Sequence, residues 1–139
     1  MNAASPGERS VRFVVVPCSG IGKTYGTVSR EAAYALTEEL RPGATRLVAL
    51  SRLVLGDEQS RAAIAAYPAL TIDGCKLACA TAMVRLCGGQ VLHEFAVLEA
   101  YRRYRQFKPA GIAELNEGGR QLARALALEI ASVVDGLEG

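Results

Sequence analysis

The chain has 139 residues, half of them apolar, and its 16 basic and 14 acidic side chains give a formal charge of +2. A chain of this length fits one domain that can bury a core without disulfide bonds. The near-neutral charge argues against a dedicated nucleic-acid-binding protein, which usually carries a strong basic excess. No apolar run approaches the ~20 residues of a membrane-spanning helix, so we expect neither nucleic acid nor membrane as a partner.

Strand and helix patterns alternate along residues 11–139, which we expect to form one α/β domain after a tail at residues 1–10. β-branched runs closed by Pro or Gly predict strands, and apolar residues at helical spacing predict helices. The expected strands are 11–16, 46–50, 69–73 and a weaker one at 90–94. The expected helices run from about Val28 to Leu40, from the cap Asp57 to Tyr67, from about Cys75 to Leu86, from Phe95 to Tyr104, and along an apolar stripe from Leu115 to Leu137.

This alternation implies right-handed parallel crossovers and a sheet with helices on both faces. We therefore predict a three-layer α/β sandwich whose central, mostly parallel sheet has about four strands in the order 2-1-3-4. Ligands bind such sheets at the carboxyl ends of the strands, where the strand order reverses. The first and third strands would flank that point.

Cysteines follow both of these strands. Cys18 comes just after the first strand and Cys75 just after the third, so they should meet at the same edge of the sheet. A helix beginning near Cys75 would place Cys79 one turn further on the same face. Its N-terminus would favour the thiolate of Cys75, the form that binds metal and attacks electrophiles. Three converging thiols are therefore the main functional signal in the sequence.

The fourth cysteine and the single histidine do not fit this group as well. Cys87 lies eight residues beyond Cys79, about 12 Å along a continuous helix, which is too far for one ion to reach both sulfurs. We therefore interpret Cys87 as a packing residue. His93 lies in the weak fourth strand, where it could reach the same edge, but we favour a structural role.

The segments Pro17-Cys18-Ser19-Gly20 and Ile72-Asp73-Gly74-Cys75-Lys76-Leu77-Ala78-Cys79-Ala80 resemble the DGC-domain family of small zinc-binding proteins. The resemblance covers about residues 11–135 and implies a zinc site made by four cysteines. Three carry over to this chain: Cys18, Cys75 and Cys79. Many members have another cysteine after the second strand, where this chain has residues 49–52 without one. The resemblance thus implies three protein ligands, with water, a substrate group or Asp73 in fourth place. Asp73 could equally cap the helix that follows.

Other motif interpretations are weaker. The glycine-rich turn before Lys23 and Thr24 lacks the first glycine of a phosphate-binding loop, because Pro17 stands there. We interpret it as a turn that lets the first helix approach Cys18, with Lys23 lowering the pKa of that thiol. A cysteine phosphatase would need arginine where Thr24 stands. The aromatic and basic residues 101–108 fit an amphipathic helix better than a single-strand-binding surface.

Cysteine usage also favours the cytoplasm, where thiols stay reduced and serve metal or catalytic roles. The apolar run 11–16 is too short for a secretory signal and contains Arg12. Three hypotheses for the function remain open: a zinc-binding protein; a cysteine-based carrier of sulfur or electrons, including an iron–sulfur protein; and a domain that docks a protein partner. The sequence identifies no reaction, substrate or oligomeric state, so whether the protein is an enzyme stays open.

Overall fold

The computed structural model of the chain describes residues 11–18, 23–74, 77–112 and 114–138. The expected tail at residues 1–10 lies outside them. The strands are β1 (Phe13–Pro17), β2 (Thr45–Leu47), β3 (Ala69–Asp73) and β4 (Val91–Ala96). The helices are α2 (Thr24–Tyr34), α3 (Leu50–Leu55), α4 (Glu58–Ala66), α5 (Cys79–Leu86), α6 (Val97–Arg103) and α7 (Glu117–Glu138), with a π-helix η1 (Ala35–Leu40) and a 3-10 helix η2 (Arg105–Phe107).

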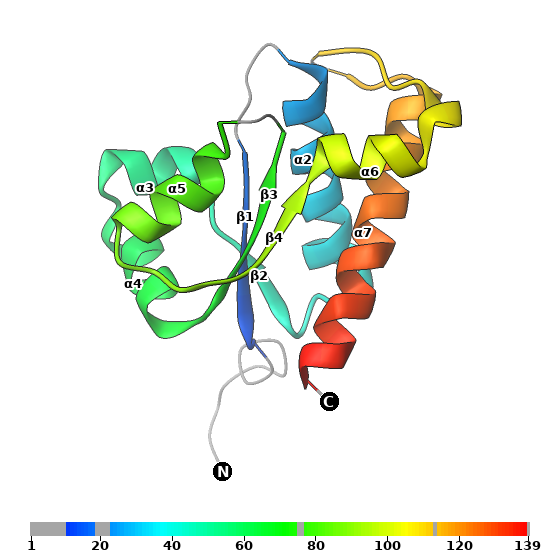
Figure 1. The fold of residues 1–139 in the computed structure, drawn as a ribbon. Helices are drawn as coiled ribbons and strands as arrows, with labels where there is room; N and C mark the ends of the chain where they lie inside the picture. Colours follow the sequence, from blue (N-terminus) through cyan, green and yellow to red (C-terminus); the bar gives the residue numbers. More distant parts are fainter. Residues whose placement is uncertain (1–10, 19–22, 75–76, 113, 139) are drawn as a thin grey trace.

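Within the described residues the strands form one four-stranded parallel sheet in the order β2-β1-β3-β4 (Figure 1). The predicted fold class and strand order are therefore confirmed. The chain runs from β1 to β2, which pairs with β1 on one side, and then to β3, which pairs with β1 on the other side. The strand order thus reverses between β1 and β3, and this reversal locates the edge at which such folds bind ligands.

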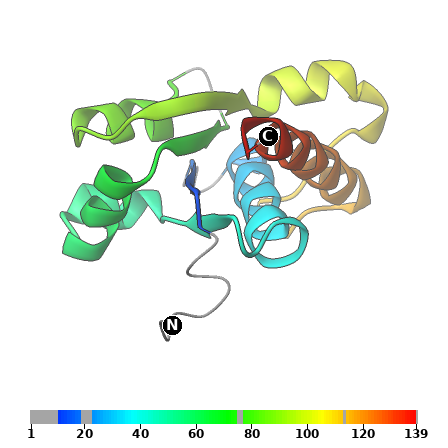
Figure 2. The same cartoon turned by 90° about the horizontal axis from the view of Figure 1, so that it is seen from below.

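Side chains of β1 alternate between two cores. Phe13 and Val15 pack on the face covered by α2, α6 and α7, whereas Val14 and Val16 pack on the face covered by α3, α4 and α5. Figure 2 shows these two groups of helices on opposite sides of the sheet. Because both faces are covered, β1 has a continuous apolar sequence, as the central strands of parallel sheets do.

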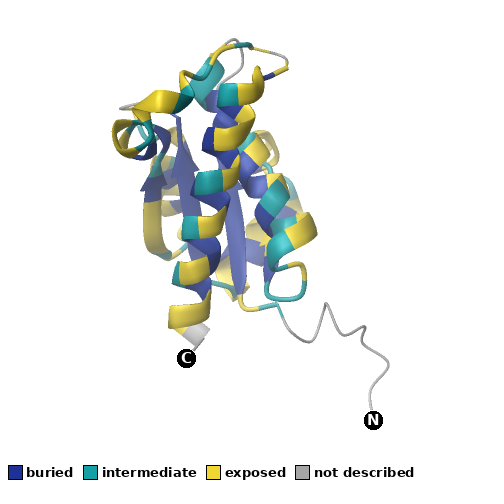
Figure 3. Cartoon of the chain, turned by 90° about the vertical axis from the view of Figure 1, so that its right-hand side faces the viewer, coloured by how far each residue is buried: buried dark blue, intermediate teal, exposed yellow. Residues whose placement is uncertain are grey.

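The C-terminal helix α7 packs along α2 and η1 with one apolar stripe. Leu122, Leu126 and Ile130 are buried, and buried and exposed residues alternate along the helix in Figure 3. Burying each of these side chains contributes about 1.5–3 kcal/mol. The predicted stripe is too long at both ends, because Leu115 is buried before the helix begins and Leu137 is exposed. None of the described helices, α7 included, is both long and apolar enough to span a membrane.

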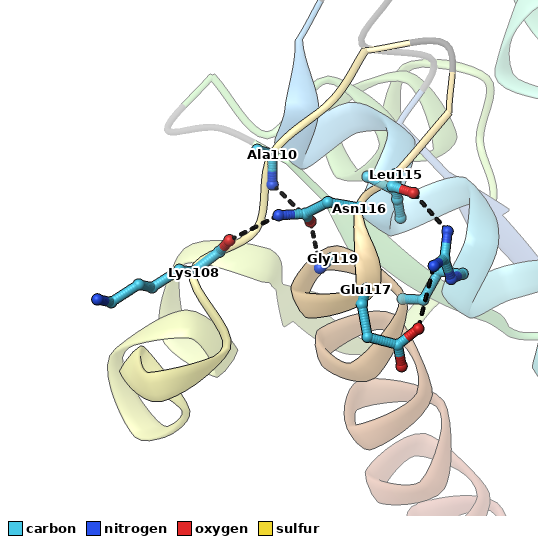
Figure 4. Close-up of polar contacts among 7 residues, drawn as sticks. Lys108, Ala110, Leu115, Asn116, Glu117 and Gly119 are labelled. Atoms are coloured by element: carbon cyan, nitrogen blue, oxygen red, sulfur yellow. Dashed lines mark hydrogen bonds and ion pairs between the residues drawn. The ribbon is translucent and has the colours of Figure 1, made fainter.

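Side chains cap both α7 and α4. Asn116 caps α7 (Figure 4): its Oδ1 accepts hydrogen bonds from the N–H groups of Gly119 at 2.7 Å and Ala110 at 2.9 Å. Asp57 caps α4, as predicted, by accepting from the Ser60 N–H at 2.9 Å. Hydrogen bonds from Ser60 also hold the pKa of the Asp57 carboxyl below its ordinary value. Each cap satisfies a backbone donor that has no partner inside its helix.

Predicted element boundaries are wrong near Leu50 and near Phe95. Leu50, expected at the end of the second strand, begins α3 and is buried there with Leu53. A short apolar run is ambiguous between strand and helix, and here packing on the sheet decides for the helix. Phe95, expected in a helix, lies in β4, and α6 ends at Arg103 before the turn η2. The amphipathic helix expected through residues 101–108 is therefore broken.

Candidate metal site

Cys18 directly follows β1, and both its backbone N–H and its backbone carbonyl form hydrogen bonds. Its N–H donates to the Ile72 carbonyl of β3 at 2.7 Å, and its own carbonyl accepts from the Ser29 hydroxyl of α2 at 3.0 Å. The residue is 5% exposed. Cys18 therefore lies buried between β1, β3 and α2, at the reversal of strand order.

The chain that leaves β3 lies against the first turn of α2. A Cβ atom added to Gly74 would lie 2.9 Å from the backbone nitrogen of Gly26 and 2.9 Å from the carbonyl carbon of Tyr25. Such distances are too short for any residue with a side chain, so glycine is required for this approach. The same helix thus contacts Cys18 and the residue that precedes Cys75.

Tyr25 contributes its ring to the core at this point. The ring lies 6.0 Å from that of Tyr101, centroid to centroid. Burial, and then the neighbouring Tyr101, raise the pKa of the Tyr25 hydroxyl above its ordinary value. Tyr25 therefore stays a neutral phenol at physiological pH.

Asp73 is a helix cap. Its Oδ1 accepts from the Ala80 N–H at 2.8 Å, and its Oδ2 accepts from the Thr81 hydroxyl at 2.6 Å. The Asp73 side chain is buried. The Thr81 hydroxyl also lies 2.6 Å from the Thr71 hydroxyl. Of the two roles that the sequence left open for Asp73, the structure shows the capping of α5.

Helix α5 begins at Cys79, which corrects the predicted start near Cys75. The residue before it, Ala78, has a left-handed backbone with φ of 50°, so the chain turns sharply just ahead of the helix. The helix N-terminus therefore lies at Cys79, and Cys75 itself lies outside the described residues. Cys79 is exposed, in contrast to Cys18.

Cys87 and His93 lie away from Cys18. Cys87 ends α5, with its Sγ 3.8 Å from the Sδ of Met83, and packs against the core beneath α3, α4 and α5. His93 is exposed and stacks on Phe95, with ring centroids 4.4 Å apart. It pairs with Leu70, the second residue of β3, so His93 does not reach the carboxyl edge.

In the part of the chain that the structure describes, no three His, Cys, Asp or Glu side chains come close enough to hold a metal ion. Cys75 and most of the glycine-rich turn before Lys23 lie outside the described residues. The set Cys18, Cys75 and Cys79 therefore stays a prediction.

Sequence reasoning missed one residue that positions this edge. Ser29 is buried, and its hydroxyl donates to the carbonyl of Cys18. Its sequence position gave no signal, since serine in a helix is commonly a solvated residue.

Comparison with known proteins gives one match. Searches of curated proteins and of solved structures found none. The family model described as the DGC domain matches residues 14–118, about three quarters of the chain, and this range includes Cys18, Cys75 and Cys79. The chain therefore belongs to the DGC-domain family.

Proposed function

We propose that this protein binds zinc through the thiolates of Cys18, Cys75 and Cys79 at the carboxyl edge of the sheet. The placement of Cys18 carries the proposal: it is buried where the strand order reverses, with backbone bonds to both β3 and α2. The contact of Gly74 with α2 supports it, because the second cysteine-bearing segment starts beside the same helix.

The donor set fits zinc. Thiolate sulfur is a preferred zinc ligand, and sites with three protein ligands keep a fourth position for water or substrate. Asp73 supplies no ligand in this proposal, because both of its oxygens accept hydrogen bonds from α5. Zinc bound in this way would supply Lewis-acid chemistry at its open position. We place the protein in the cytoplasm, since a thiolate site needs reduced cysteines.

Thiol chemistry is the second candidate, and the exposure of Cys79 at the start of α5 favours it. An accessible thiolate at a helix N-terminus can attack an electrophile, and a neighbouring thiol can resolve the product. An iron–sulfur cluster on the same three cysteines is a variant of this candidate.

Metal analysis of protein purified without oxygen separates these functions. The proposal predicts about one zinc per chain and no visible absorption, because zinc thiolates are colourless. Iron together with a brown chromophore would instead indicate an iron–sulfur cluster. A metal-free protein with titratable thiols would contradict zinc binding and favour thiol chemistry as the function.

Cysteine variants test the ligand set. We expect Cys18→Ser, Cys75→Ser and Cys79→Ser each to lose most of the zinc, because two thiolates hold the ion much more weakly than three. Cys87→Ser is the matched control and should keep the wild-type zinc content. A folded Cys75→Ser protein that retains all of its zinc would contradict the proposal.

A further inference from the structure

A cavity of about 380 Å³ opens beside the Cys18 segment, on the β2 side of β1. Its described lining comes from Arg30 and Tyr34 of α2, residues 49–51 at the start of α3, Pro17 of β1 and Leu47 of β2. The volume falls within the range of small-molecule sites. The cavity therefore adjoins the carboxyl edge of the sheet, and neither Cys18 nor Cys79 is among its described lining residues.

The guanidinium of Arg30 is incompletely paired. Its Nη2 donates to the Thr27 hydroxyl at 3.1 Å. Its Nη1 is buried and has no hydrogen-bond partner among the described residues. No carboxylate in the described residues forms an ion pair with Arg30. A buried cationic donor without a partner is unfavourable, so Arg30 would gain free energy from an anionic acceptor.

The rest of the lining fits an anion with an apolar part. No acidic residue lines the cavity among the described residues, and Tyr34 and Ser51 bring hydroxyl groups. Leu47, Leu50 and Pro17 add apolar surface. An arginine among apolar side chains, with few other polar groups, is a common arrangement for carboxylate and phosphate recognition.

We propose that this cavity binds the oxyanion group, carboxylate or phosphate, of a small organic molecule through Arg30. The proposal goes beyond zinc binding and does not depend on it, because none of the described residues that line the cavity is a cysteine. It places the ligand next to the Cys18 segment, since Pro17 lines the cavity and Ser29, the neighbour of Arg30, holds the carbonyl of Cys18.

Nitrogen NMR of the arginine side chains tests this in the wild-type chain. Inorganic phosphate and acetate are titrated separately at constant ionic strength, and the Nε–Hε signals of Arg30 and Arg105 are followed. Arg105 is exposed in η2 and forms no ion pair with a described residue, so it reports non-specific binding. We expect a saturable shift at Arg30 and none at Arg105. A shift with phosphate alone or acetate alone identifies the oxyanion.

Matched variants give the size of the effect. Arg30→Met should weaken binding of the effective anion at least ~10-fold, the value of one charge-assisted hydrogen bond, whereas Arg105→Met should leave it unchanged. The wild-type titration decides the question if Arg30→Met does not fold. Absence of any shift at Arg30, or equal shifts at Arg30 and Arg105, would overturn the proposal. Zinc content has no part in this readout, so failure here leaves the metal site untouched.

Discussion

The two described cysteines of the candidate site lie in contrasting surroundings. Cys18 is 5% exposed, and hydrogen bonds to Ile72 and Ser29 fix its backbone. Cys79 is exposed at the start of α5, after a left-handed residue. The first cysteine is part of the core, and the second lies on the surface of the same edge. In the proposed site, metal or reagent would therefore approach from the α5 side, where Cys79 is exposed.

Thiol labelling of the reduced, metal-free protein tests this contrast with the largest expected effect. Cys18 should react with iodoacetamide on the order of 100-fold more slowly than Cys79, because reagent reaches a buried thiol only after local opening. Peptide mass spectrometry after timed quenching measures both rates in one sample. Equal rates would mean that Cys18 is not protected by the contacts described above.

Substitutions of Asp73 test what holds the start of α5 against the end of β3. Asp73→Ala should lower the free energy of unfolding by about 2–3 kcal/mol, because the Ala80 N–H and the Thr81 hydroxyl lose a buried charged acceptor. Asp73→Asn keeps one acceptor oxygen and should lose less. Denaturant titration measures both. A folded Asp73→Asn protein that loses its zinc would make Asp73 a ligand and contradict the capping role.

Substitution of Gly74 tests the close contact between the chain that leaves β3 and the first turn of α2. Gly74→Ala should cost about 1–2 kcal/mol, because the added Cβ meets backbone atoms of Tyr25 and Gly26 that have little room to move. Gly136→Ala is the matched control: it lies exposed in α7 with nothing near the added Cβ, so helix propensity should stabilise the protein by about 0.5–1 kcal/mol. Equal thermal melting curves for the two variants would refute the close approach.

Ala78 gives the smallest expected effect. Ala78→Gly should raise stability by up to ~1 kcal/mol, since glycine adopts a left-handed backbone without the penalty that Cβ imposes. The same substitution at Ala62, an exposed position inside α4, should instead lower stability by about 0.5–1 kcal/mol. Changes in stability of the same sign for the two variants would show that the turn before Cys79 is not strained.

The sequence predicts the frame of this fold well. β3 is predicted with its observed bounds, because Pro68 and Gly74 bracket an apolar run. The alternation of strands and helices leads to the observed strand order. The start of α5 was missed, because the left-handed turn at Ala78 uses a residue type that gives no turn signal.

The candidate site is predicted only in part. Topology places Cys18 at the edge of the sheet, but the hydrogen bonds of its backbone are made with Ser29 of α2 and Ile72 of β3, and the sequence pattern does not predict these contacts. The role of Asp73 was ambiguous because a carboxylate can serve a helix or a metal. Only the contacts with Ala80 and Thr81 distinguish these roles.

Zinc protection of individual cysteines tests the central claim most directly. The wild-type protein is alkylated with and without one equivalent of zinc, and the extent of labelling is measured for each cysteine-containing peptide. Our account predicts that zinc protects Cys18, Cys75 and Cys79 together and leaves Cys87 as reactive as before. Unchanged labelling of Cys79 in the presence of bound zinc would contradict the three-thiolate site.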